Sequence, residues 1–183
     1  MMVNLSNDVE KVLLSEDEIS DIIKDLGKRI TEDYKGKNLL LVSVLKGSIV
    51  FMADLMRSID LQCRIDFMAV SSYGDGTKTS GRVKIIKDLD LDLAGYDLLI
   101  VEDILDSGVT LSYIKNMLKG RGPRSIKICT FLDKPERRIA KDIIADYIGT
   151  TVPDEFVIGY GLDYDEKYRN LPYLGVLKRE IYA

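Results

Sequence analysis

Two adjacent acids stand at the end of a strongly apolar run in the middle of the chain. Glu102 and Asp103 directly follow the apolar residues 98–101. A third acid, two hydroxyls and a glycine come next: Asp106, Ser107, Gly108 and Thr110. Carboxylate oxygens accept hydrogen bonds from sugar hydroxyls and bind Mg²⁺, whereas hydroxyl and backbone N–H groups donate to phosphate. These residue types therefore predict a site for a sugar phosphate.

The surrounding pattern indicates how this segment is positioned. Residues 98–101 have the length and branched side chains of a strand that is buried on both faces of a parallel sheet. In open α/β sheets, ligands bind at the carboxyl ends of such strands. Leu111, Ile114 and Leu118 have the spacing of one helical face, so we expect a helix to begin at the glycine loop. Its amino terminus would stabilise a phosphate, although a strand, a solvated acidic turn and a capped helix without a ligand would have the same letters.

Strands and helices alternate along the rest of the chain. Ser15 and Glu18 form a capping box at the start of a helix that should end near Lys35 and Gly36. Further strands are expected at residues 38–44, 64–70, 83–86 and 125–132, and a further helix at 48–58. Residues 72–82 are polar and glycine-rich, which predicts a mobile loop. The alternation is typical of a doubly wound α/β sheet in a single domain over residues 1–183.

The composition excludes several kinds of site. The 183 residues include no histidine, which removes histidine bases, Ser–His and Cys–His nucleophile pairs, and histidine-ligated metals. Acid–base chemistry must then use carboxylates, Lys or Tyr. Cys63 and Cys129 lack the paired spacing of a zinc or redox site, so we expect reduced, buried thiols.

The charge and hydropathy patterns limit the partners. The formal net charge is −4 and both signs are mixed, which argues against nucleic-acid binding. No stretch approaches the ~20 apolar residues that span a bilayer, and residues 1–11 lack the apolar core of a signal peptide. We therefore expect no membrane contact and a cytoplasmic location.

One segment matches a known motif closely. Residues 101–111, VEDILDSGVTL, resemble the phosphoribosyl-pyrophosphate-binding motif of the type I phosphoribosyltransferases. Further segments narrow the resemblance to the bacterial hypoxanthine(-guanine) phosphoribosyltransferases: LKG at 45–47, SY at 72–73, DKPER at 133–137, FVIGYGLDY at 156–164 and YRNL at 168–171. The resemblance covers nearly the whole chain.

The resemblance implies a fold. In the type I phosphoribosyltransferase fold, a central and mostly parallel sheet is flanked by helices and carries a small hood. The hood would be formed mainly by about residues 153–183 together with the N-terminal segment. The family also has a strand near residues 145–149, whereas the spacing of Ile139, Ile143 and Ile144 favours a helix over 137–147. Both possibilities stay open at this point.

The family's reaction joins a purine nitrogen to the anomeric carbon of phosphoribosyl pyrophosphate and releases pyrophosphate. The resemblance thus implies purine salvage, with Mg²⁺-dependent transfer to hypoxanthine, and to guanine as well, giving IMP and GMP. Glu102, Asp103 and Asp163 would be the ribose and metal acids. Pyrophosphate contacts are implied for Lys46, Gly47, Ser72, Tyr73 and Arg169. In this family the turn at Lys46 often contains a non-proline cis peptide bond.

The resemblance also assigns the phosphate loop and the general base. The 5′-phosphate would be wrapped by Asp106, Ser107, Gly108, Val109 and Thr110. Asp106 would in addition take a proton from N7 of the purine. Its alternative role is to cap the helix that follows.

Purine recognition is implied for four residues. Lys134 would donate to the exocyclic O6 of a 6-oxopurine, and Phe156 would cover the ring. Val157 and Asp163 would add backbone contacts to the ring edge. From composition alone, Phe156 would instead be a core residue and Lys134 a solvated charge.

Other functions stay open. A related phosphoribosyltransferase would prefer xanthine or guanine. A regulator would bind phosphoribosyl pyrophosphate without catalysis, although such proteins usually add a DNA-binding module or a basic face. A phosphoryl-transfer protein would use Glu102, Asp103 and Asp106 as an acidic Mg²⁺ site. For the assembly, the resemblance implies a homodimer or a homotetramer.

Overall fold

The computed structural model describes residues 5–72 and 83–183, which form two sheets. The larger sheet has six strands in the order β4-β3-β2-β5-β6-β7. The strands span Leu39–Leu45 (β2), Cys63–Ser72 (β3), Val83–Lys87 (β4), Asp97–Leu105 (β5), Ser125–Asp133 (β6) and Tyr147–Thr151 (β7). All neighbouring strands are parallel except β3 and β4. The expected α/β architecture with a mostly parallel sheet is confirmed.

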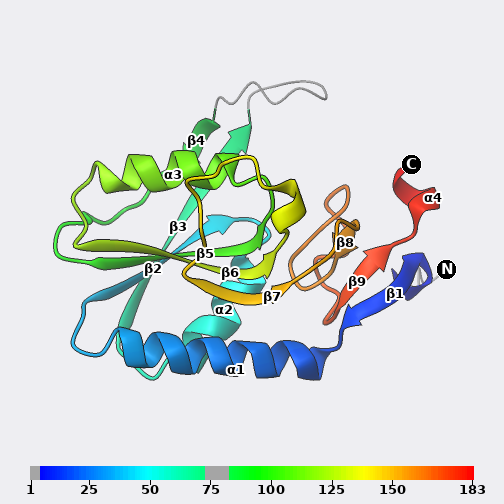
Figure 1. Cartoon of the computed structure of the whole chain (residues 1–183), viewed down its shortest axis with the longest axis horizontal. Coiled ribbons are helices and arrows are strands. Elements are labelled where there is room, and N and C mark those ends of the chain that lie inside the picture. The colour runs from blue at the N-terminus through cyan, green and yellow to red at the C-terminus, as the bar shows by residue number, and fades with distance from the viewer. Residues whose placement is uncertain (1–4, 73–82) are drawn as a thin grey trace.

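Helices cover both faces of this sheet. The helices are α1 (Glu16–Asp33), α2 (Ile49–Ser58) and α3 (Val109–Lys119). α1 and α2 lie on one face, and α3 lies on the other (Figure 1). α1 begins at the predicted capping box, in which the Ser15 side chain accepts from the N–H of Glu18 and the Glu18 carboxylate accepts from the N–H of Ser15.

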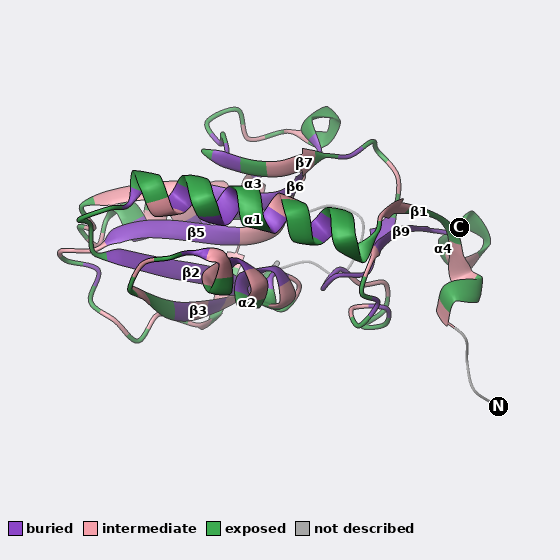
Figure 2. Ribbon diagram, turned by 90° about the horizontal axis from the view of Figure 1, so that it is seen from below, coloured by how far each residue is buried: buried purple, intermediate pink, exposed green. Residues whose placement is uncertain are grey.

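The hydrophobic core is divided between the two faces because neighbouring strand residues point in opposite directions. In β5, Leu99 and Val101 pack into the core with α1 and α2, while Leu98 and Ile100 pack into the core with α3. The central strands β2 and β5 are buried along most of their length beneath α1 (Figure 2). The loop that follows β5 therefore extends from a deeply buried strand.

A small antiparallel sheet stands beside the carboxyl ends of the main strands (Figure 1). Its strands, in the order β1-β9-β8, span Val9–Leu14 (β1), Leu174–Leu177 (β9) and Val157–Ile158 (β8). Short helices lie next to these strands and after β6: η1 (Leu5–Asp8), α4 (Arg179–Tyr182) and η2 (Pro135–Arg137). The small sheet thus combines the N-terminal segment with the last part of the chain, as the resemblance implies for a hood.

Two local expectations differ from the structure. β5 continues to Leu105, so Glu102 and Asp103 lie within the strand rather than after it. The predicted helix over 137–147 is wrong, because the chain forms turns after η2 and enters β7 at Tyr147. Ile143 is buried whereas Ile139 is exposed, so the isoleucine spacing does not mark one face. The strand implied by the resemblance in this region is present.

Three further expectations concern the cysteines, membrane-spanning helices and the loop at residues 72–82. Cys63 and Cys129 are both free thiols, and Cys129 is buried while Cys63 is partly buried. No helix in the described part of the chain has the length and apolar content needed to cross a membrane. Most of the predicted loop at 72–82, including Tyr73, lies outside the described residues.

Candidate active site

The side chains of Glu102 and Asp103 lie in two different places because the two acids are consecutive residues of a strand. Their side chains leave β5 on opposite faces. Glu102 lines a small cavity of about 70 Å³ together with the loop that follows the strand. Asp103 faces the turn after β2, where a side chain on Gly47 would overlap its Oδ2 atom. The glycine therefore allows the turn to approach the carboxylate closely.

Both carboxylates are held in surroundings that disfavour their charge. Burial raises the pKa of Glu102 well above its ordinary value, and the neighbouring charge of Asp103 raises it further. Burial also raises the pKa of Asp103 to about 6, an effect opposed by the N–H of Ile104 and by Arg169 and increased by Asp163. A cation beside either carboxylate would be favoured electrostatically.

The donor set fits Mg²⁺ that is shared with a phosphate ligand. Mg²⁺ is usually held by one or two carboxylates and by substrate phosphates rather than by a complete protein cage. Within residues 5–72 and 83–183, no group of three or more acidic or thiol side chains gathers into a ready metal site. Asp163 instead forms an ion pair with Arg169 at 2.9 Å. The two β5 acids form no such ion pair within the described residues, so they are the first candidate hard-oxygen ligands, and Asp163 beside Arg169 is a further candidate.

The loop after β5 leads directly into α3. Gly108 is the N-cap of α3 with φ of 74°, in the left-handed region that favours glycine, and no side chain caps the helix. The alternative role of Asp106 as a helix cap is therefore wrong. Its carboxylate instead accepts a hydrogen bond from the N–H of Ser107. The first N–H groups of α3 have no partner within the helix, so the cavity lined by Ser107, Gly108 and Thr110 is suited to an anion.

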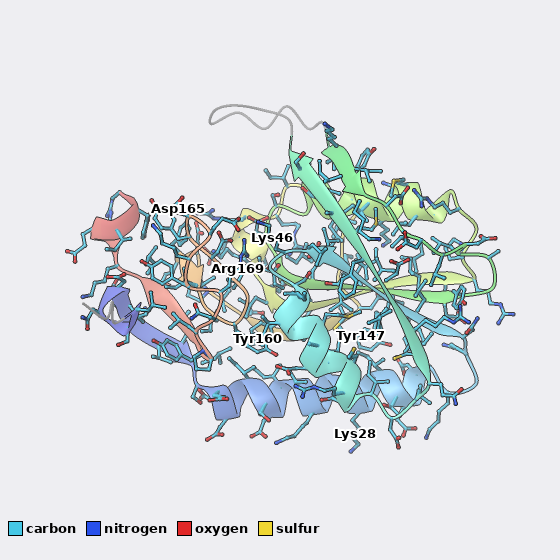
Figure 3. All side chains as sticks on the ribbon, turned by 180° about the vertical axis from the view of Figure 1, so that it is seen from behind. Lys28, Lys46, Tyr147, Tyr160, Asp165 and Arg169 are labelled. Carbon is cyan, nitrogen blue, oxygen red and sulfur yellow. The ribbon has the colours of Figure 1, made fainter. Side chains whose placement is uncertain are left out.

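Two basic side chains converge at the edge of the small sheet. Lys46 follows a cis peptide bond after Leu45, and its ammonium forms an ion pair with Glu166 at 2.7 Å. Arg169 donates to the same carboxylate at 3.2 Å and to the carbonyl oxygen of Gly161 at 2.9 Å. Figure 3 shows Lys46 and Arg169 together where the turns of the small sheet meet the main sheet. Both can therefore reach one anion.

Lys134 is buried rather than solvated. It is 5% exposed, its backbone N–H donates to the carbonyl oxygen of Leu105 at 2.9 Å, and its ammonium donates to that of Glu155 at 2.7 Å. Burial lowers the pKa of Lys134, and the charge of Asp106 acts in the opposite direction. The ammonium also forms an ion pair with Asp154 at 3.7 Å, and the backbone hydrogen bond to Leu105 connects the ends of β5 and β6.

Phe156 is an exposed ring rather than a core residue. It remains 36% exposed. Its ring stacks on that of Tyr182, with 4.8 Å between the ring centroids, and meets the ring of Tyr164 edge-on, with 5.5 Å between the centroids. Val157, the next residue, is buried in β8 and pairs with Val176 of β9. The strand therefore holds the ring at the surface, where a flat ligand can stack on it.

Three residues of this region were not singled out from the sequence. Arg138 and Asp133 form an ion pair beneath the loop after β5. Tyr182, next to the C-terminal residue, supports Phe156. The sequence signal for this pair is the DKPER segment that matches the family: Asp133 is its first residue, and Arg138 follows it directly. Tyr182 had none, because a terminal tyrosine has no informative spacing.

A larger cavity shares Arg169 with the candidate site but none of the other groups described above. It has a volume of about 510 Å³ between α1, α2 and the turn at residues 169–172. Size would favour it as a ligand site. It is lined by none of the β5 acids, the phosphate loop, Lys134 or Phe156. The convergence of those groups therefore decides where the candidate site lies.

Comparisons with known proteins identify the family. Residues 12–165 match the model of the phosphoribosyl transferase domain. A hypoxanthine-guanine phosphoribosyltransferase of Streptococcus thermophilus is 55% identical over 97% of the chain and 98% of its own length. A solved hypoxanthine phosphoribosyltransferase of Staphylococcus aureus is 53% identical with a TM-score of 0.96, over 100% of this chain and 99% of that one. The bifunctional protein TilS/HprT of Listeria monocytogenes is 54% identical over 98% of this chain, which spans 28% of that relative's length.

Proposed function

Because the chain belongs to the phosphoribosyl transferase family, we propose that it transfers the 5-phosphoribosyl group of phosphoribosyl pyrophosphate to hypoxanthine and guanine. The products would be IMP or GMP and pyrophosphate. The observation that carries this proposal is that Lys134 contacts both parts of the site. Its backbone N–H donates to the carbonyl oxygen of Leu105 in β5, and its ammonium donates to the carbonyl oxygen of Glu155, which directly precedes Phe156. A phosphate cradle and an exposed aromatic ring would thus serve one site.

The donor would bind along the ends of β2 and β5. Its 5′-phosphate would occupy the cavity of residues 106–110 and accept hydrogen bonds from backbone N–H groups and from Ser107 and Thr110. Lys46, Gly47 and Arg169 would face the pyrophosphate, Arg169 through its planar fork. Ser72 and Tyr73 stay predictions for the same group.

Glu102 and Asp103 would hold Mg²⁺ and the ribose hydroxyls, with Asp163 as ligand of a second ion. When bound, the metal supplies charge neutralisation to the leaving pyrophosphate. The raised pKa values of Glu102 and Asp103 support this role, because a nearby cation would favour the ionised carboxylates.

Asp106 would act as general base. Its carboxylate accepts a hydrogen bond from the N–H of Ser107, and the match of residues 101–111 to the family motif supports placing it beside the purine. In that position it can take the proton from N7 as the purine attacks the anomeric carbon. With no histidine in the chain, a carboxylate is the base that the composition provides.

Purine choice would depend on Lys134 and Phe156. The buried ammonium of Lys134 has N–H donors beyond the one used by Glu155, and a 6-oxo oxygen would accept one. The amino group of adenine would instead meet a cationic donor, which disfavours it. Phe156 would stack on the ring, and Val157 and Asp163 would add backbone contacts.

The direct test is purine-dependent release of pyrophosphate. Purified protein with Mg²⁺ and phosphoribosyl pyrophosphate should form IMP with hypoxanthine and GMP with guanine, with adenine used poorly. A higher kcat/KM for xanthine would place the chain with a related transferase. Binding of phosphoribosyl pyrophosphate without turnover of any purine would identify a sensor and contradict the proposal. Assembly as a homodimer or homotetramer and a cytoplasmic location stay predictions.

A further inference from the structure

The side chain of Arg138 lies beneath the loop that follows β5. Its Nε donates to the carbonyl oxygen of Asp106 at 2.8 Å, and its Nη2 donates to that of Leu105 at 3.1 Å. Nη1 donates to the carbonyl oxygen of Ile143 at 3.1 Å. Nη2 also forms an ion pair with Asp133, and the two side chains are only 17% and 14% exposed. Four acceptors within the protein thus use this guanidinium.

The residues after Arg138 continue this contact. The N–H groups of Ile139 and Ala140 both donate to the carbonyl oxygen of Ser107 at 2.9 Å. Three consecutive carbonyls, at residues 105–107, are therefore held by residues 138–140. Gly108 makes room for this segment, since a Cβ there would lie 3.2 Å from Cδ of Arg138.

Fixing these carbonyls also fixes the N–H groups on the opposite side of each peptide. In a planar trans peptide, a carbonyl and the following N–H point in opposite directions. Holding the carbonyl of Asp106 therefore aims the N–H of Ser107, which is the donor to the Asp106 carboxylate. Holding the carbonyl of Ser107 aims the N–H of Gly108 away from residues 138–140, toward the cavity side of the loop.

The same contacts connect the donor side with the purine side. The carbonyl oxygen of Leu105 accepts from Arg138 and also from the backbone N–H of Lys134. Asp133, the partner of Arg138, directly precedes Lys134 at the end of β6. One guanidinium thus ties the loop that holds Asp106 to the strand end that presents Lys134.

We propose that Arg138 is a positioning residue for phosphoribosyl transfer. Its guanidinium, helped by the N–H groups of Ile139 and Ala140, sets the backbone of residues 105–108 so that the phosphate is bound and the Asp106 carboxylate is aimed at the purine. This inference rests on the proposed function. We assign Arg138 no contact with substrate, because four of its five N–H groups are committed to protein acceptors.

Arg138→Lys tests the geometry while keeping the positive charge, because an ammonium cannot meet three separated carbonyls as a planar fork does. We expect kcat to fall about 10- to 100-fold through misplacement of Asp106, and KM for phosphoribosyl pyrophosphate to rise about tenfold through lost loop donors. KM for hypoxanthine should change less than about threefold, since stacking on Phe156 is unaffected. The matched control is Arg137→Lys, an exposed neighbour paired with Asp154, which should keep both constants.

A double-mutant cycle separates positioning from general stabilisation. If Arg138 acts through Asp106, then adding Arg138→Lys to Asp106→Asn should lower kcat by less than about threefold, because the base is already absent. A fully additive loss of kcat would overturn the proposal. Unchanged kinetics in Arg138→Lys would overturn it as well.

Amide hydrogen exchange without substrates tests the loop independently of activity. Arg138→Lys should speed exchange in residues 106–110 about tenfold while the amides of α1 keep their rates. Equal exchange rates in the loop would overturn the proposal even if the wild-type chain is an active transferase. Conversely, a wild-type chain without transferase activity would remove the proposed function, while faster exchange would still support the restraint on the loop. If Arg138→Lys folds poorly, Asp133→Asn gives a milder loosening of the same contacts and should shift exchange in the same direction.

Discussion

The two halves of the candidate site are built in different ways. The donor half, residues 102–110, belongs to a buried central strand and the helix that follows it, and backbone groups do most of the positioning. The acceptor half is carried by turns and the small sheet, where Phe156 remains exposed and leans on Tyr164 and Tyr182. Substitutions in the donor half should therefore affect catalysis, whereas substitutions at Lys134, Phe156 or Tyr182 should affect which base is bound.

The two halves also differ in how many residues have a left-handed backbone conformation. The donor loop needs one left-handed residue, Gly108. The acceptor half contains several left-handed residues in close succession: Gly159, Tyr160, Gly161, Asp165, Glu166 and Tyr168. Four of these are not glycine, a conformation that is uncommon outside turns. Contacts with Gly47 and the loop carrying Arg169 hold this path in place.

The largest effect is expected from removing the proposed base in the donor half. Asp106→Asn keeps an oxygen that can accept the N–H of Ser107 but cannot take a proton. We expect kcat to fall about 10²–10⁴-fold with little change in either KM. Steady-state kinetics with hypoxanthine measures this effect, and a variant with near wild-type turnover would remove Asp106 from the mechanism.

Gly47→Ala should break the junction between the two halves. The added methyl group would overlap Oδ2 of Asp103, so either the turn or the carboxylate must move. We expect kcat/KM for phosphoribosyl pyrophosphate to fall about 10²-fold, which is typical of a misplacement near 1 Å. Gly120→Ala is the control, because the backbone of Gly120 is right-handed and this residue lies at the opposite end of α3 from the loop after β5. Equal activity of the two variants would contradict this close approach.

Lys134→Met should change base selection more than donor use. The substitution keeps much of the buried volume but loses the ammonium that would meet O6. We expect kcat/KM for hypoxanthine to fall about 10- to 150-fold, as for the loss of a charged hydrogen bond of roughly 1.5–3 kcal/mol. The value for adenine should not fall. Lys141→Met, at an exposed position, is the control, and full retention of selectivity in Lys134→Met would show that the oxygen is recognised elsewhere.

Tyr182→Ala should give the smallest change, confined to the purine. An aromatic pair contributes about 0.5–1.5 kcal/mol beyond its area, so we expect KM for hypoxanthine to rise about 2- to 12-fold. KM for phosphoribosyl pyrophosphate should stay the same. Tyr182→Phe keeps the stacked ring and should restore the wild-type value. A Phe variant as poor as the Ala variant would rule out stacking as the cause.

The donor half could be predicted well from the sequence because its chemistry is contiguous. An apolar strand, two acids, a glycine loop and a periodic helix follow one another within residues 98–118, and each part has a known local signal. The end of β5 was placed too early, since acids at the edge of a sheet do not have to end a strand. The spacing of Ile139 and Ile143 also favours a helix, but in the structure both residues lie outside helices, between η2 and β7.

The supporting contacts could not be predicted in the same way. Arg138 acts through carbonyl oxygens, which every residue has, so no side-chain pattern announces its partners. Lys134 is buried by its contacts with Leu105 and Glu155, which lie far from it in the sequence. The stack of Tyr182 on Phe156 joins a residue of α4 to the residue before β8. Such contacts depend on tertiary structure and have no local signal.

A crystal structure of the wild-type protein with Mg²⁺, phosphoribosyl pyrophosphate and an unreactive 6-oxopurine analogue would test the division of the site most directly. The 5′-phosphate should accept hydrogen bonds from N–H groups of residues 107–110, and the purine should stack on Phe156 with its oxygen at the Lys134 ammonium and N7 at Asp106. A phosphate bound elsewhere, or a purine seated away from Phe156 and Lys134, would contradict this division.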